Sequence, residues 1–300
     1  MNEVDFTSCR RIPGRAYNGA NGKKLAVEWR GSCWILKFPP SAAGRPNDLS
    51  YSNSCFSEHL ASSIFRMLGI RTQETVLGTF SNGRRHVVCA CRDFTDGSHI
   101  LHDFCSIKNT VLDSESNGTG TELSSVLETI DGQRFVDPVE LRRFFWDMFV
   151  ADAFLGNFDR HNGNWGFLVD RATGLAEIAP VFDCGSCLLP QADERIMRKI
   201  LADEAELEAR IYTFPSSMLK IGGEKIGYAR FLADPPEDLK SAIDRIVPRI
   251  DMPAISSFVD EVPYLTDLQR VFYKTYLLAR YDRLLRPFAK KTCHLRRENG

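Results

Sequence analysis

The sequence has almost no net charge, because 38 Lys and Arg side chains face 39 Asp and Glu, giving a formal charge of −1. No bulk attraction to nucleic acid or to an anionic membrane is therefore expected. No apolar run approaches the ~20 residues of a membrane-spanning helix, and the first eleven residues have no hydrophobic signal core. We expect a cytoplasmic protein without a membrane partner or direct nucleic-acid contact; secretion as an effector stays open.

The sequence also lacks a cysteine framework. Its nine cysteines are odd in number and scattered, which favours reduced thiols over disulfides. Cys184 and Cys187 have the C-x-x-C spacing, and Cys89 with Cys91 would supply four ligands in all. A structural zinc site usually has two clean pairs of that spacing. Ordinary buried or loop thiols are the favoured interpretation, and a zinc or redox role is the alternative.

There is no internal repeat, and 43% hydrophobic residues suffice for a large core. The front of the chain has the pattern of short strands around one helix. Strands are predicted at 24–29 and 33–38, and again at 74–80 and 86–91, where Asn82-Gly83 suits a hairpin turn. Between the hairpins, apolar residues recur at helical spacing from Phe56 to Leu68, and Gly69 ends that helix.

The back of the chain is predicted to be mostly helical. Asp137-Pro138 opens a strong helix that ends at Gly156, and a hairpin follows over 165–182. Further helices are expected near 195–212 and 265–285, whereas the Ser- and Gly-rich stretch 108–121 predicts a mobile surface loop. The pattern indicates an α+β fold with two lobes, residues 1–94 and 95–300.

Three polar side chains of the second lobe suggest a site. Asp159 and Asn164 lie five residues apart, and Asp183 follows across the predicted hairpin. Strands of similar length bring their outer ends together, so Asn164 and Asp183 are expected side by side. One carboxylate and one amide oxygen suit Mg²⁺ that is held mostly by ATP. Asp159 is placed to accept the hydroxyl proton of an acceptor, which is the arrangement of phosphoryl transfer.

The first lobe supplies the complementary groups. Lys37 ends an apolar strand, where a charge is expected to be paired or to bind a ligand, and Glu58 on the following helix is its best partner. A loop of small residues before the first strand is rich in backbone amides that can cover phosphates. This loop runs from Tyr17 to Lys24.

Each group taken alone has a plainer explanation. The segment from Asp159 to Asn164 is also compatible with a simple connection between helix and strand. Lys37 fits an edge residue whose amine reaches solvent, and Glu58 fits an acid in the first turn of a helix. The order of the groups along the chain favours the kinase interpretation, because coincidence of all of them is improbable.

Two stretches carry a family resemblance. The run Gly156-Asn157-Phe158-Asp159-Arg160-His161-Asn162-Gly163-Asn164, followed by Pro180-Val181-Phe182-Asp183-Cys184-Gly185-Ser186, resembles the HipA-like serine/threonine kinases, in their short, CtkA-like form. The strand that ends in Leu-Lys-Phe-Pro-Pro is similar too. The resemblance extends, with gaps, from about Tyr17 to Leu189, and beyond it the sequence offers only a compatible helical pattern.

The resemblance implies a protein-kinase-like fold with ATP between the lobes, and a Ser/Thr protein substrate. It implies Asp159 as catalytic base, Asn164 and Asp183 as magnesium ligands, Lys37 as the phosphate-contacting lysine and His161 as an aid to proton transfer. The resemblance also implies which residues cover ATP, namely Asn18, Gly19, Ala20, Asn21, Gly22 and Lys23. The segment that contacts adenine is expected near 91–94.

The chain departs from the longer HipA-type proteins, whose extra N-terminal subdomain has no counterpart in this pattern. The stretch 17–24 has no Ser or Thr, so silencing by phosphorylation of the phosphate loop is not expected. An antitoxin-like partner stays unproven.

Two rival functions remain: a phosphoinositide-like or small-molecule kinase, which shares the D-R-H-x-x-N loop, and a nucleotide-binding pseudokinase. The absence of Lys and Arg from 184–193 favours a protein substrate over a lipid.

Overall fold

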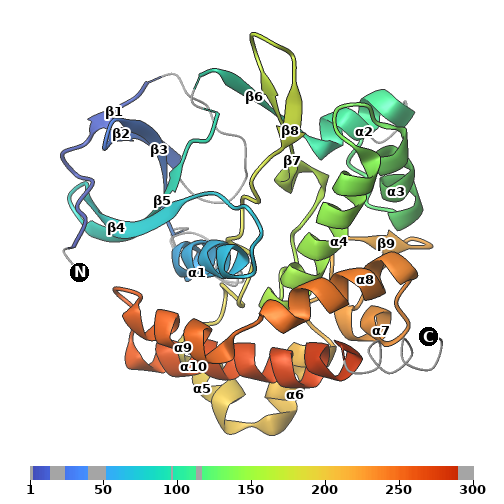
Figure 1. Cartoon of the computed structure of the whole chain (residues 1–300). Coiled ribbons are helices and arrows are strands. Elements are labelled where there is room, and N and C mark those ends of the chain that lie inside the picture. The colour runs from blue at the N-terminus through green and yellow to red at the C-terminus, as the bar shows by residue number, and fades with distance from the viewer. Residues whose placement is uncertain (1–2, 14–23, 40–51, 96, 113–116, 290–300) are drawn as a thin grey trace.

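The computed structural model describes residues 3–13, 24–39, 52–95, 97–112 and 117–289. A strand-rich lobe and a helical lobe face each other (Figure 1). The first lobe is built on a five-stranded antiparallel sheet in the order β1-β2-β3-β5-β4. Its strands are β1 (Arg10–Arg11), β2 (Lys24–Trp29), β3 (Ser32–Lys37), β4 (Thr75–Ser81) and β5 (Arg85–Arg92).

The β2–β3 hairpin fixes the position of Lys37. The turn residues Arg30 and Gly31 have φ of 50° and 72°, the left-handed conformation that a tight hairpin turn requires. The resulting register pairs Lys24 with Lys37 across the two strands. Directly opposite residues of an antiparallel pair project from the same face of the sheet, so both lysines leave the hairpin on one side.

The helix of the first lobe, α1 (Ser54–Met67), covers one face of this sheet. Its apolar stripe is buried, and Gly69 follows its end with φ of 76°. Glu58 lies in the second turn, so the interpretation as a first-turn acid is wrong. The predicted positions of this helix and of both hairpins are confirmed to within two residues.

The second lobe is mostly helical, and α4 runs through its centre (Figure 1). Asp137 caps α4 by accepting from the Val139 amide at 2.8 Å, and Gly156 ends it with φ of 66°. The helices are α2 (Phe104–Leu112), α3 (Leu123–Gly132), α4 (Pro138–Leu155), α5 (Glu194–Ala202), α6 (Glu204–Tyr212), α7 (Tyr228–Ala233), α8 (Glu237–Ile246), α9 (Met252–Glu261) and α10 (Asp267–Ala279), with short 3-10 turns at Asn162–Asn164 and Val247–Arg249 and a π-turn at Arg280–Leu285.

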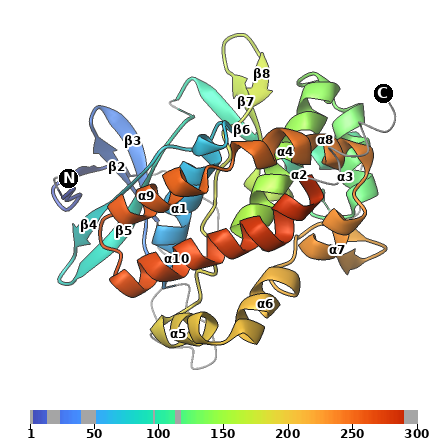
Figure 2. The ribbon, with the colours of Figure 1, turned by 60° about the horizontal axis from the view of Figure 1, so that its bottom comes forward.

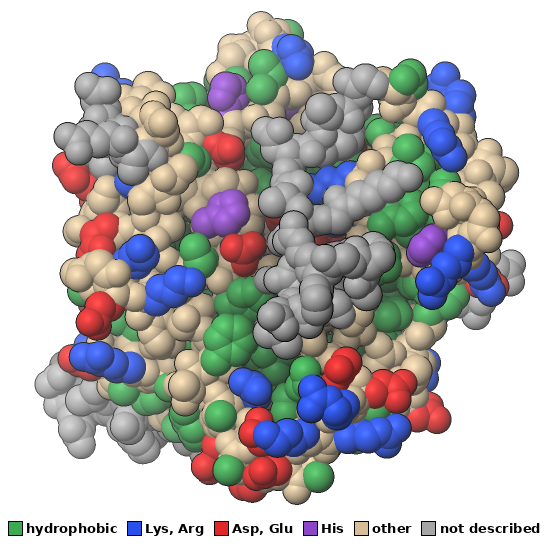
Figure 3. Space-filling model, turned by 180° about the vertical axis from the view of Figure 1, so that it is seen from behind, with side chains coloured by type: hydrophobic (Ala, Val, Ile, Leu, Met, Phe, Trp, Pro, Cys, Tyr) green, Lys and Arg blue, Asp and Glu red, His purple; other side chains and the backbone are tan. Residues whose placement is uncertain are grey.

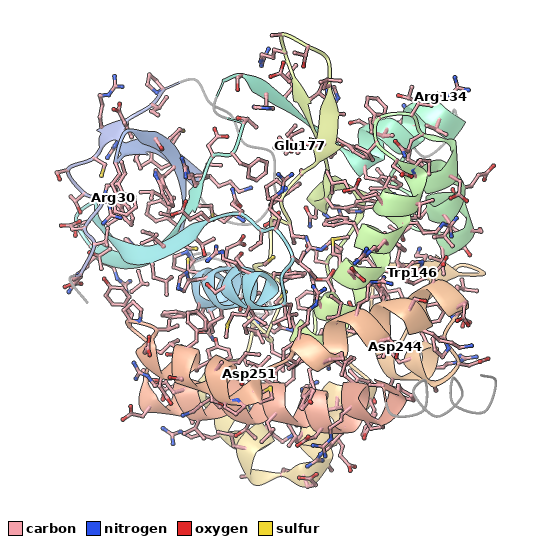
Figure 4. All side chains as sticks on the ribbon, viewed as in Figure 1. Arg30, Arg134, Trp146, Glu177, Asp244 and Asp251 are labelled. Atoms are coloured by element: carbon pink, nitrogen blue, oxygen red, sulfur yellow. The ribbon has the colours of Figure 1, made fainter. Side chains whose placement is uncertain are left out.

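Two small sheets complete the lobe. One joins β6 (His99–Asp103), β7 (Gly166–Asp170) and β8 (Ala176–Ile178), and the other pairs β9 (Lys220–Ile221) with β10 (Glu224–Lys225). Arg71, just before β4, donates to both carboxylate oxygens of Glu177 on β8 at 3.2 Å, and Figure 4 labels Glu177. This exposed ion pair joins the first lobe to the β7–β8 hairpin.

Several predicted boundaries are corrected. The expected loop 108–121 begins as helix, because α2 continues to Leu112, and residues 113–116 lie outside the described ranges. The single helix expected over 195–212 is two helices, and β8 is shorter than expected because it ends at Ile178. The β9–β10 hairpin was not predicted.

A single large core extends through α1, the facing side of β4 and β5, and the helices of the second lobe. Trp146, labelled in Figure 4, lies on α4 and is 1% exposed among aromatic neighbours from α4 and α7. A smaller core of eight buried residues fills the other face of the first sheet. Figure 2 shows α9 and α10 crossing α1, and the His59 ring of α1 lies 6.0 Å from the Phe258 ring of α9, so the helix of the first lobe contacts the second.

The surface agrees with the balanced composition. Over the described part of the face shown in Figure 3, basic and acidic side chains are interspersed without an extended field of one sign. Among the described helices, none has the length and hydropathy needed to cross a bilayer.

Candidate active site

Three segments that are far apart in the sequence meet at Lys37. Its ammonium donates to Glu58 Oε2 at 2.9 Å and to Asp183 Oδ1 at 2.9 Å. Glu58 is 1% exposed, and its second oxygen accepts from the backbone N–H of Cys184 at 3.2 Å. The lysine is therefore paired rather than reaching into solvent, and β3, α1 and the segment after β8 are locked to one another.

Electrostatics keep Lys37 and Asp183 charged. Burial lowers the pKa of Lys37, but the carboxylates of Asp183 and Glu58 outweigh it and raise that pKa well above its ordinary value. In turn, the charge of Lys37 lowers the pKa of Asp183 to about 2. Near neutral pH the site thus presents an ammonium beside an ionised carboxylate.

The backbone at Asp183 is unusual. Its φ is 55°, a left-handed conformation that is uncommon for a residue other than glycine but tolerated by Asp. Such conformations persist where the surroundings impose them, and they are frequent at functional sites. Here the conformation lets the Asp183 carboxylate reach Lys37 while the next amide, that of Cys184, reaches Glu58.

The loop after α4 holds its polar side chains by internal hydrogen bonds. The amide N–H of Asp159 donates to Asn157 Oδ1 at 3.0 Å, and Asn164 Nδ2 donates to the Asp159 carbonyl at 2.8 Å. The amide nitrogen of Asn164 is engaged in this way, which leaves its side-chain oxygen as the acceptor, and Asn164 lines the cavity between the lobes. His161 Nδ1 accepts from the Gly163 amide at 3.0 Å, so a neutral His161 carries its proton on Nε2.

Arg160 ties this loop to Asp183. Its guanidinium is buried against Asp152 of α4, with Nε 3.0 Å from Oδ2. It also donates to the carbonyls of Asn164 at 2.9 Å and Phe182 at 2.6 Å. One buried ion pair thus fixes the backbone next to both expected metal ligands. Sequence reasoning missed Asp152, because a single acid on a buried helix gives no signal of its partner.

Asp159 differs from Asp183 in its surroundings. Burial raises the pKa of Asp159, and the nearby charge of Asp183 adds to that effect. His161, Arg160 and Lys225 only partly oppose it, so the pKa lies above its ordinary value. A carboxylate with a raised pKa is a stronger base, which suits a group that accepts a proton.

A cavity of about 380 Å³ opens between the lobes at these groups, within the usual size range of small-molecule sites. Its described lining consists of Lys24, Ile35, Lys37, Gln73, Asp93, Phe94, Thr95, Leu101, Asp103, Gly163, Asn164, Phe182 and Asp183. Asp93 and Phe94 fall in the stretch expected near adenine. Lys24 is a second cation that sequence reasoning missed, because its position depends on the strand register that pairs it with Lys37.

A larger cavity of about 730 Å³ lies elsewhere, between the outer part of the first sheet and the turn before α10. Its described lining contains none of the groups just discussed, so we place the chemistry in the smaller cavity. The loop residues Asn18 to Lys23 lie outside the described ranges.

The zinc alternative finds no support. Among the described residues, no three His, Cys, Asp or Glu side chains gather as a metal site would require. Cys89, Cys91, Cys184 and Cys187 are all buried free thiols, and burial raises the pKa values of Cys89 and Cys187 well above the ordinary thiol value. They are core thiols.

The fold and these groups define a class. A strand-rich lobe with a Lys–Glu pair faces a helical lobe with two Asp and one Asn across a cavity, which is the plan of a protein-kinase-like phosphotransferase.

Comparison with known proteins identifies the family. The HipA-like C-terminal domain family matches residues 16–252. The serine/threonine-protein kinase CtkA of Helicobacter pylori (strain J99) is 45% identical over 287 residues, which cover 95% of this chain and 87% of the relative. The crystal structure of the Helicobacter pylori proinflammatory kinase CtkA matches with a TM-score of 0.92 and 44% identity, over 98% of this chain and 99% of that chain.

A more distant structure shares the fold alone. It is Shewanella oneidensis HipA, solved with HipB and operator DNA, with 18% identity and a TM-score of 0.57 over 97% of this chain and 75% of that one.

The chain belongs to the HipA-like family, and it is a serine/threonine-protein kinase. The expected α+β, two-lobed, kinase-like fold is confirmed. As a class, kinases of this kind use ATP and a divalent metal.

Proposed function

We propose that this kinase uses Mg²⁺ and ATP to phosphorylate Ser or Thr hydroxyls of a protein substrate, which can include itself. The observation that carries the proposal is the pairing of Lys37 with both Glu58 and Asp183 at 2.9 Å across the cavity. In this arrangement Lys37 binds the non-transferred phosphates, and Glu58 holds Lys37 in place. We also propose residues 1–94 as the N-lobe and 95–300 as the C-lobe, since Asp93 and Phe94 line the cavity where the chain passes between them.

Asn164 and Asp183 fit a magnesium ion. Both line the cavity, one with an amide oxygen and the other with an ionised carboxylate, and Mg²⁺ prefers such oxygen ligands. When bound, Mg²⁺ and ATP supply the phosphoryl group and neutralise the charge on its oxygens. Lys24 adds a second positive charge on the same side of the cavity and is proposed to contact a phosphate.

Asp159 is proposed as the catalytic base. Its carboxylate accepts the hydroxyl proton of the acceptor, and its raised pKa supports that task. His161 adjoins it, and its Nε2–H is proposed to orient the acceptor oxygen or assist proton transfer. The segment 18–23 is proposed to cover the phosphates.

The test compares isosteric variants of the two acids. Asp159→Asn and Asp183→Asn are expected to lower transfer of labelled phosphate from ATP to casein by about 10²-fold or more. The matched control is Asp234→Asn, an exposed acid after α7, which should retain wild-type activity. Circular dichroism and thermal unfolding establish that each variant is folded.

Undiminished activity of the folded Asp183→Asn variant would reject the proposed roles. Two further arms address the rival functions. Transfer to phosphoinositide vesicles but not to protein would favour a lipid kinase, whereas tight binding of ATP and Mg²⁺ without turnover, even onto the chain itself, would favour a pseudokinase.

A further inference from the structure

We propose that the β9–β10 hairpin is the docking site for the acceptor, and that Lys220 and Lys225 bind acidic side chains near the phosphorylated Ser or Thr. This inference rests on the proposed function, because it assumes a protein acceptor. It adds a preferred substrate class, namely acceptor segments with Asp or Glu beside the target hydroxyl.

The hairpin places two like charges together. Lys225 pairs directly with Lys220 across the two strands, so both side chains project from the same face. Like charges directly opposite each other are destabilising. Within the described ranges neither lysine has an ion-pair partner, and the one side-chain contact of the Lys225 ammonium is with Met218 Sδ at 3.3 Å. An anion bound between the lysines would relieve this repulsion.

The hairpin is held firmly in spite of that repulsion. The turn amides of Gly222 and Gly223 both donate to the Glu122 carboxylate, at 2.6 and 3.2 Å. At its base, the Lys220 amide donates to the Thr121 carbonyl at 2.9 Å, and the Thr121 hydroxyl donates to the Met218 carbonyl at 2.7 Å. The hairpin lies beside the start of α3 (Figure 1) and presents a preformed surface.

The segments on both sides of the hairpin are bonded to the catalytic loop. Asn162 Nδ2 donates to the carbonyls of Gly118 and Gly120, at 2.8 and 2.9 Å, just before Thr121. On the other side, the Tyr228 hydroxyl donates to the Asn157 carbonyl at 2.6 Å. These bonds join the segments that flank the hairpin to Asn157 and Asn162, which lie two and three residues from Asp159.

The lysines lie on the side of the base and not of the nucleotide. Leu219, which directly precedes Lys220, lines a small cavity together with Arg160, the residue that follows Asp159. Neither hairpin lysine is part of the described lining of the cavity between the lobes. The acceptor approaches Asp159, so an acidic acceptor segment is the occupant that this placement fits, in preference to ATP.

The neighbouring acids leave that face positive. Glu224 precedes Lys225 in β10, and successive side chains of a strand point to opposite faces, so Glu224 projects away from the lysine pair. The Glu122 carboxylate is occupied by the two glycine amides.

The test uses two synthetic peptides with one Ser each, flanked by Asp and Glu in one and by Lys and Arg in the other. Wild-type enzyme is expected to phosphorylate the acidic peptide with the lower KM, and that KM should rise with NaCl. Lys225→Glu and the double variant with Lys220→Glu should raise the KM for the acidic peptide about tenfold and improve use of the basic one. The KM for ATP should change less than about twofold, since the nucleotide side is untouched.

Arg134→Glu is the matched control, because it changes the charge equally at an exposed residue far along the surface of the second lobe (labelled in Figure 4). It should behave as wild type. The wild-type enzyme could phosphorylate proteins without preferring either peptide, or Lys225→Glu could leave the KM values of both peptides unchanged. Either result would reject the proposed docking site at the hairpin and leave the proposed kinase function standing. A rise in the KM for ATP alone would assign the lysines to the nucleotide and overturn the inference. No transfer to any protein would reject both.

Discussion

Asp159 and Asp183 are two carboxylates at one site with opposite surroundings. Lys37 keeps Asp183 ionised with a pKa of about 2, while burial raises the pKa of Asp159. Environments that push the pKa values of neighbouring acids apart are how one site provides both a permanent anion and a proton acceptor. The division between metal ligand and base that we propose follows this difference.

The pH dependence of the rate should report Asp159. Because its pKa in the folded protein is above the ordinary value, kcat/KM is expected to fall as the pH drops through that raised pKa, at a pH where Asp183 is still ionised. A pH–rate profile for phosphorylation of casein measures it, with far-UV circular dichroism at each pH as the folding control. An acid limb at or below the ordinary Asp pKa of about 3.9 would contradict this assignment.

The same shifts have consequences of opposite sign for stability. The lowered pKa of Asp183 contributes stability that is fully present above its unfolded value of about 3.9 and is lost as the pH falls toward about 2. The raised pKa of Asp159 works against folding at neutral pH, where its buried charge is unfavourable. Asp159→Asn should therefore have a Tm equal to or above that of wild type while losing activity.

At the scale of single residues, the sequence predicted those site residues whose chemical role allows only a few residue types. Lys37 and Glu58 were expected to pair, and they do, whereas the direct contact of Lys37 with Asp183 was not predicted. Lys24 and Asp152 were missed, because their importance depends on strand register and on helix packing. Neither the strand register of Lys24 nor the packing of Asp152 can be read from the neighbouring residues in the sequence.

Among the elements, α4 and the loop after it depend on one buried contact. Asp152 is 2% exposed and pairs with Arg160, which in turn holds the carbonyls of Asn164 and Phe182. Removing one partner of a buried ion pair leaves the other charge uncompensated, at a cost of about 3–5 kcal/mol.

Asp152→Asn is accordingly expected to lower the free energy of unfolding by about that amount and to reduce kcat of the folded fraction. Urea unfolding and steady-state kinetics measure the two effects. Asp137→Ala is the control, because it removes only the cap of α4 and should cost about 1 kcal/mol without changing kcat. An Asp152→Asn protein with wild-type stability and kcat would show that the pair has no such role.

Elements with strong local signals were predicted well. The capping Asp137, the following proline and Gly156 set the bounds of α4 as expected. The β9–β10 hairpin was missed although Gly222-Gly223 is a turn signal, since its strands have only two residues each and their pairing depends on Glu122 and Thr121. The continuation of α2 through Lys108 was missed because that residue opens a stretch rich in Ser, Asn and Gly, although Lys108 itself is buried.

At the scale of the whole molecule, the two lobes share a core. Asn53, just before α1, donates to the Ala192 carbonyl at 2.6 Å and accepts from Gln269 at 2.9 Å. At the other end of α1, Arg249 donates to the Leu68 carbonyl at 3.1 Å. The main core includes α1 and the facing strands together with the helical lobe. Independent unfolding of the first lobe would expose this shared surface.

We therefore expect a single unfolding transition. Trp29 and Trp34 report on the first lobe, and Trp146 and Trp165 report on the second. In one variant the first pair is replaced by Phe, and in a second variant the other pair is replaced, so that the fluorescence of each variant reports on one lobe. In each variant the urea midpoint measured by fluorescence should equal the midpoint measured by far-UV circular dichroism. Separate midpoints for the two signals would contradict a shared core.

The attachment of α1 to the second lobe at both of its ends also limits how the activity of such an enzyme can be regulated. In many kinases the helix that carries the glutamate swings to break the lysine contact, and that movement is the switch. Here hydrogen bonds attach both ends of the helix to the second lobe, and the contact of Glu58 with Lys37 is already formed in the folded chain. With the roles that we propose for these residues, we expect activity to be regulated through access of nucleotide and acceptor, and not by movement of α1.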